Sequence, residues 1–179
     1  MIKSYSRKYF ETIHSNLNEL SDKEFFKFIH LLENVKKNNT KVIFIGNGGS
    51  AAMASHSSVD FTKTCKIRAI NFNEADLITC FANDYGYENW LKEALKSYAN
   101  KDDLVIAISS SGQSKNIHKA AKYCKRNKIK LVTFTGFKKN NPVKKFGDVN
   151  FWVNSSKYNI VEMTHHIWIL MSVDYLSKK

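Results

Sequence analysis

Two short segments rich in glycine and serine could bind an anion. The first, GNGGS at 46–50, follows an apolar run at 42–45, and the second, SSSGQS at 109–114, follows an apolar run at 104–108. Glycine lets backbone N–H groups approach a ligand closely, and serine hydroxyls are neutral hydrogen-bond donors. A buried strand, such a turn and a helix N-terminus together form a phosphate site. The residues expected to bind phosphate are Asn47, Gly48, Gly49, Ser50, Ser109, Ser110, Ser111 and Ser114.

Neither segment matches the better-known phosphate loops. The first lacks both the G-x-G-x-x-G spacing of dinucleotide-binding proteins and the Gly-Lys-Ser/Thr ending of a Walker-type loop. Taken alone, GNGGS is equally compatible with a tight turn between a strand and a helix. Two such segments about sixty residues apart are difficult to explain as turns, so we favour a binding site.

Histidines and carboxylates outside these loops could transfer protons or bind a metal. His56 and Asp60 are four residues apart after the first loop, so a helix places them on one face. Near the C-terminus, Glu162 has helical spacing to both His165 and His166. These side chains are ordinary zinc ligands. A histidine and an aspartate on one helix face are nevertheless more often surface or capping residues.

The elements that must position these residues alternate between strand and helix. Strands are expected at 42–45, 68–72, 104–108, 130–135 and 149–153, and helices at 51–58, 88–98, 116–127 and 159–176, with a short helix or turn at 76–83. Residues 3–37 have helical apolar stripes, Tyr9, Phe10, Ile13 and Leu17 in one helix and Phe25, Phe26, Ile29, Leu32 and Val35 in the next. We expect a single three-layer αβα domain over 1–179, with N-terminal helices at 1–37 and a core at 41–176. Its sheet should be five-stranded, parallel and flavodoxin-like, with both loops at the switch in strand order.

The two loops resemble those of the sugar isomerase (SIS) domain family, especially its phosphoheptose isomerase branch. The resemblance runs from about residue 41 to 176 and includes FANDYGYENW, from which Asn83 and Asp84 are expected to contact substrate. It implies an aldose–ketose isomerase that converts sedoheptulose 7-phosphate to D-glycero-D-manno-heptose 7-phosphate for surface polysaccharide. The alternative is a non-catalytic SIS module that binds a sugar phosphate or a protein partner.

The resemblance also implies roles for individual residues. His56 matches a metal-binding histidine of the family, and Asp60 matches a glutamate that is both ligand and catalytic acid/base. The family's glutamine and histidine on the last helix align with Val161 and Ile169, or with Glu162 and Leu170 if the frame moves by one, so the histidine is lost either way. The expected zinc ligands are His56, Asp60, Glu162 and His166, and the expected catalytic residues are Asp60, Glu162 and His165. Without a metal, Glu162 and one histidine would contact a neighbouring subunit or substrate hydroxyls.

Composition limits the remaining function classes. The net charge of +12 invites a nucleic-acid hypothesis, but the lysines are dispersed and no aromatic-basic signature accompanies them, so we expect no nucleic-acid partner. Three widely spaced cysteines give no disulfide framework, and no apolar run approaches the length of a membrane span. We therefore expect a cytoplasmic protein, and the resemblance implies a homotetramer to which the N-terminal helices contribute.

Overall fold

The order of helices and strands follows the sequence prediction, apart from one short 3-10 helix between the last two strands that was not predicted. The computed structural model describes residues 1–178. Its helices are α1 (Ile2–Leu17), α2 (Asp22–Lys37), α3 (Gly49–Lys63), α4 (Ala75–Tyr85), α5 (Trp90–Tyr98), α6 (Lys115–Arg126), the short 3-10 helix η1 (Lys144–Phe146) and α7 (Tyr158–Ser177). Its strands are β1 (Val42–Ile45), β2 (Ala69–Asn71), β3 (Leu104–Ser109), β4 (Lys130–Thr135) and β5 (Val149–Trp152). The segment expected as a short helix or turn is the helix α4.

The five strands form one parallel sheet in the order β2-β1-β3-β4-β5. This is the flavodoxin-like order that the sequence predicted, and the order reverses between β1 and β3. These two strands are neighbours, with Ile45 of β1 paired to Ala107 of β3. Because parallel neighbours end at the same edge of the sheet, the glycine loop and the serine loop lie side by side.

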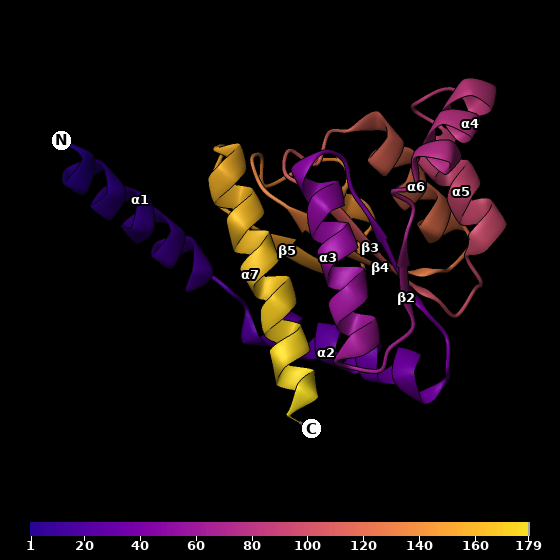
Figure 1. Ribbon diagram of the computed structural model, residues 1–179, viewed down its shortest axis with the longest axis horizontal. Coiled ribbons are helices and arrows are strands. Elements are labelled where there is room, and N and C mark those ends of the chain that lie inside the picture. The colour runs from indigo at the N-terminus through magenta and orange to yellow at the C-terminus, as the bar shows by residue number, and fades with distance from the viewer. Residues whose placement is uncertain (179) are drawn as a thin grey trace.

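Both faces of the sheet are covered, as the uniformly apolar strands require. Val42 and Phe44 of β1 face a core that α2, α3 and α7 complete, and Ile43 and Ile45 face a second core that α5 and α6 complete (Figure 1). Successive side chains of a strand point to opposite faces, so one short run of four apolar residues serves both cores. The expected αβα layering is confirmed.

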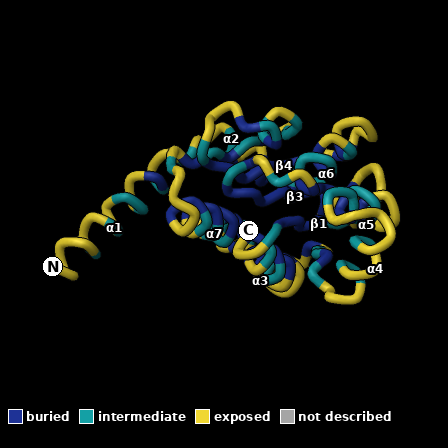
Figure 2. Tube along the Cα trace, turned by 90° about the horizontal axis from the view of Figure 1, so that it is seen from above, coloured by how far each residue is buried: buried dark blue, intermediate teal, exposed yellow. Residues whose placement is uncertain are grey.

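The two N-terminal helices differ in how far they are covered. Helix α2 packs against the sheet, whereas α1 extends away from the body and is largely exposed along its length (Figures 1 and 2). Phe10, which belongs to the apolar stripe of α1, is 66% exposed in the single chain. In α2 the expected apolar stripe is wrong at one position, because Phe26 is 55% exposed and Phe28 is fully buried instead. Phe28 lies on the side of the helix that meets the sheet, where its ring contacts those of two β-strand phenylalanines.

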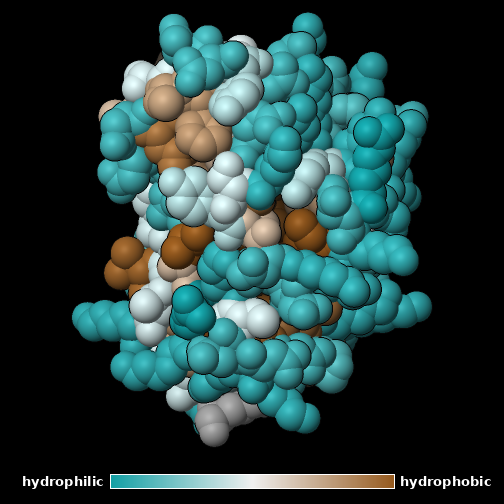
Figure 3. Space-filling view, turned by 90° about the vertical axis from the view of Figure 1, so that its right-hand side faces the viewer, coloured by the Kyte–Doolittle hydropathy of each residue, from teal (hydrophilic) through white to brown (hydrophobic). Residues whose placement is uncertain are grey.

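The side of the molecule that carries α4, α5 and α6 is mostly hydrophilic, with hydrophobic side chains showing only in separate patches (Figure 3). This agrees with a chain that contains 28 basic and 16 acidic residues. Within residues 1–178, no helix combines the length and apolar character needed to span a bilayer.

Candidate active site

A polar cavity lies where the glycine loop and the serine loop meet. Its volume is about 120 Å³, and it is lined by Asn47, Ser50, Ile108, Ser109, Ser110, Ser111, Ser114, Tyr158 and Glu162. The structure therefore brings together all four predicted serines of the second loop with Asn47 and Ser50 of the first. Typical ligand pockets enclose roughly 300–1,000 Å³. This smaller cavity suits one end of an elongated ligand, such as its phosphate group.

Glycine is favoured at two positions of the first loop, by the backbone conformation at one and by a neighbouring side chain at the other. Gly48 has φ 54°, a left-handed conformation that residues with a side chain rarely adopt. Gly49 begins α3, and a Cβ atom there would displace the carboxylate of Glu162 from its present position. The loop therefore turns sharply into the helix and leaves the N-terminus of α3 open to the cavity, where backbone N–H groups attract an anion.

Glu162 of α7 contacts both loops. It projects from the first turns of α7 and accepts a hydrogen bond from Ser110 Oγ, 3.3 Å from its Oε1. Its carboxylate also lies against Gly49. Glu162 is thus beside the position expected for the phosphate.

Three of the other predicted residues form a continuous row between α3 and α7, which run side by side from the loop end of the sheet (Figure 1). His166 Nε2 lies 3.1 Å from His56 Nδ1, and His56 Nε2 lies 3.2 Å from Asp60 Oδ2. If His56 donates to Asp60 through Nε2, its Nδ1 can accept a hydrogen bond from His166 Nε2. Burial, and secondarily the neighbouring His56, lower the pKa of His166, which favours the neutral ring that this arrangement needs.

The four residues expected to bind zinc do not converge on one point. His56 contacts His166 through one ring nitrogen and Asp60 through the other, so these two partners lie at opposite edges of the ring. Glu162 is engaged with Ser110. Across the part of the chain that the structure describes, no three His, Cys, Asp or Glu side chains are arranged to hold a metal ion. The donor set therefore does not fit a tetrahedral zinc site in this arrangement.

His165 contradicts the expectation of a catalytic role. Its side chain is fully buried, with Nε2 3.0 Å from the carbonyl oxygen of Thr135 and its ring against Phe134. Burial lowers its pKa to about 4. The ring faces the sheet because residues 165 and 166 are about 100° apart around the helix axis, so only one of them can face α3. His165 is a core histidine.

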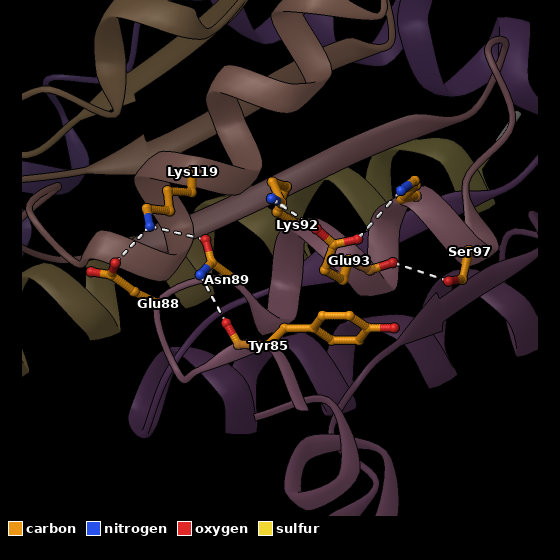
Figure 4. A network of polar contacts seen from close by, with 8 residues as sticks. Tyr85, Glu88, Asn89, Lys92, Glu93, Ser97 and Lys119 are labelled. Atoms are coloured by element: carbon orange, nitrogen blue, oxygen red, sulfur yellow. Dashed lines mark hydrogen bonds and ion pairs between the residues drawn. The ribbon is translucent and has the colours of Figure 1, made fainter. Parts of the chain in front are cut away.

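Asn83 and Asp84 are not brought into the cavity. Both are exposed at the end of α4, where the Asn83 amide donates to Asp84 Oδ1. The neighbouring Tyr87 does reach the first loop, with its hydroxyl 3.4 Å from Asn47 Oδ1. This segment is held to α6 by Lys119, whose Nζ lies 2.7 Å from Glu88 and 2.9 Å from Asn89 (Figure 4).

Sequence reasoning missed three residues of the site. Tyr158 lines the cavity from the first turn of α7, Tyr87 contacts Asn47, and Asn116 pairs with Asn47. Asn116 follows the serine loop by two residues, and Tyr87 lies within FANDYGYENW, so their nearness to motifs was the available signal. Tyr158 offered no comparable signal, because it comes close only when α7 packs beside α3.

Comparisons with known proteins show which family the chain belongs to. The SIS domain family model matches residues 7–136. The chain is 31% identical to phosphoheptose isomerase of Helicobacter pylori, covering 84% of this chain and 81% of that protein, and 31% identical to that of Fusobacterium nucleatum, covering 92% and 87%. Its fold is similar to that of phosphoheptose isomerase from Neisseria gonorrhoeae, with a TM-score of 0.88 at 21% identity over 98% of this chain and 99% of that one. The chain therefore belongs to the SIS domain family and, within it, to the phosphoheptose isomerases.

Proposed function

We propose that the protein is an aldose–ketose isomerase that converts sedoheptulose 7-phosphate to D-glycero-D-manno-heptose 7-phosphate, which supplies heptose for surface polysaccharide. The relatives named phosphoheptose isomerase support this substrate. One observation carries the proposal. The serine-lined cavity and the Asp60–His56–His166 row lie along the same pair of helices, so one elongated sugar phosphate can contact both.

The two ends of the substrate require different chemistry. The phosphate group accepts hydrogen bonds from Ser111, Ser114 and the other hydroxyls of the cavity. The reacting carbons, C1 and C2, are at the opposite end of the seven-carbon chain from the phosphate. Remote binding of the phosphate then holds these carbons against the acid–base groups, which raises turnover by orientation.

Proton transfer is assigned to Asp60 and His56 acting as one unit. A base takes a proton from C1 while the C2 carbonyl oxygen gains one, which gives an enediol. A proton is then returned to C2 as the hydroxyl on C1 loses its own, and the product is the aldose. Because Asp60 accepts from His56 Nε2, it fixes the tautomer and orientation of that ring and leaves Nδ1 as its basic nitrogen. His166 Nε2 lies against this Nδ1, so His166 must release it before Nδ1 takes the proton from C1. Glu162 is left to accept hydrogen bonds from sugar hydroxyls near the phosphate.

The test is to incubate the purified protein with sedoheptulose 7-phosphate, with and without added zinc, and to follow formation of the aldose. Turnover in either condition supports the proposal, and the comparison decides the zinc prediction, which no step above requires. Binding without turnover in both conditions would contradict the enzyme and favour the non-catalytic SIS module.

We also propose that the protein is a cytoplasmic homotetramer. The exposed apolar residues of α1 support assembly, since Ile2 is 74%, Tyr5 67% and Phe10 66% exposed on a helix that its own domain leaves largely uncovered. Light scattering should give a mass well above the 20.6 kDa of one chain. A mass near that of one chain would contradict the assembly while leaving the chemistry untouched.

A further inference from the structure

Asn47 of the glycine loop is held by a side chain that no motif of the site includes. Its Nδ2 donates to Asn116 Oδ1 at 2.9 Å, and Asn116 Nδ2 donates back to Asn47 Oδ1 at 2.9 Å. The two residues are 69 positions apart, and Asn116 is only 2% exposed at the start of α6. This reciprocal pair joins the loop after β1 to the helix after β3.

The pair also fixes which way the Asn47 amide faces. Asn116 Oδ1 accepts from the backbone N–H of Ile117 at 3.0 Å, so a flipped Asn116 amide would turn its NH₂ group toward that donor. With Asn116 fixed, Asn47 must present its oxygen to Asn116 Nδ2 and its nitrogen to Asn116 Oδ1. Within residues 1–178, the second N–H of the Asn47 amide has no protein acceptor, and Asn47 lines the cavity.

We propose that Asn116 is a positioning residue of the active site: it holds the Asn47 amide so that one N–H remains free to donate to an oxygen of the bound sugar phosphate. The inference rests on the proposed function for the identity of that ligand. Asn116 does not line the cavity, so it acts through Asn47. Tyr87 supports the same orientation, because its hydroxyl can donate to Asn47 Oδ1.

Helix α6 also holds the segment that carries Tyr87, the second residue in contact with the Asn47 amide. Lys119, one turn after Asn116, bonds Glu88 and Asn89 and thereby holds the segment that carries Tyr87 (Figure 4). The two side chains that contact the Asn47 amide are therefore fixed relative to one helix.

The test is a double-mutant cycle on the dissociation constant for sedoheptulose 7-phosphate, measured by calorimetric titration. Asn47→Ala and Asn116→Ala should each raise Kd by about five- to tenfold, the usual effect of one hydrogen bond. The variant carrying both substitutions should bind no more weakly than Asn47→Ala alone, because Asn116 acts through Asn47. Asn116→Asp, which keeps the shape but cannot donate to Asn47 Oδ1, should behave like Asn116→Ala and guards against loss of folding.

Asn150→Ala is the matched control, since that amide donates to Gly147 and accepts from Thr133 far from Asn47. It should lower the melting temperature without changing Kd. If the effects of Asn47→Ala and Asn116→Ala are additive, or if Kd is unchanged in both Asn116 variants, this inference is overturned while the proposed function stands. If wild-type protein binds the sugar phosphate but does not isomerise it, only the proposed function fails. If wild-type protein does not bind it, both are overturned.

Discussion

Replacing Asp60 with Asn tests where proton transfer takes place. The substitution keeps the shape of the side chain and removes the carboxylate that lies 3.2 Å from His56 Nε2. Glu162→Gln is the matched comparison, since it neutralises the other carboxylate of the site at the phosphate end. The two variants therefore distinguish a base in the α3–α7 row from a base in the serine-lined cavity.

The helix geometry gives the expected outcome. At a rise of about 1.5 Å per residue, His56 is about 9 Å and Asp60 about 15 Å along α3 from Ser50, which lines the cavity. C1 and C2 are remote from the phosphate, so His56 with its Asp60 partner is better placed than Glu162 to reach them. General acid–base catalysis contributes about 10²–10⁴-fold, so Asp60→Asn should raise the barrier by about 3–5 kcal/mol.

Steady-state turnover of sedoheptulose 7-phosphate measures this directly, and calorimetric titration measures binding in the same variants. Asp60→Asn should lose turnover and keep its affinity, because the serine loop is unchanged. Glu162→Gln should keep turnover within about tenfold of wild type. The reasoning fails if Asp60→Asn isomerises the sugar as fast as wild type. It also fails if Glu162→Gln alone abolishes turnover, which would identify Glu162 as the base.

Three further predictions concern binding and stability. Ser111→Ala and Ser114→Ala should each weaken sugar-phosphate binding by about 10- to 100-fold in calorimetric titration, and unchanged affinity in both would remove the serine loop from the site. Burial lowers the pKa of His165 from 6.5 to about 4 in the folded protein. Between these two pH values the unfolded chain therefore binds more protons than the folded one. The free energy of unfolding should fall as the pH drops through this range, by up to about 3 kcal/mol. Urea unfolding at about pH 7.5 and about pH 5 should show a smaller loss in His165→Gln than in wild type, and an equal loss would contradict this. Replacing the buried Phe28 with Ala should lower the free energy of unfolding by about 3–5 kcal/mol, and replacing the exposed Phe26 with Ala should lower it by less than about 1 kcal/mol. Equal losses in the two variants would mean that α2 is packed differently.

The sequence alone determined the fold and the grouping of the glycine loop with the serine loop. Both depend on short-range patterns: apolar runs mark the strands, and the glycine and serine segments that follow two of them mark the loops. A parallel sheet with right-handed crossovers brings the ends of such strands to one edge, so Asn47, Ser50 and the serines of 109–114 could be grouped without coordinates.

Only the tertiary structure decided the roles of side chains on helices. His165 and His166 are adjacent in sequence and equally able to transfer protons, yet the packing of α7 on the sheet buries the first and turns the second toward His56. The same holds for Phe26 and Phe28 of α2. Helical periodicity specifies which residues share a face, but which face meets the sheet and which meets a neighbouring helix depends on contacts between segments far apart in the chain.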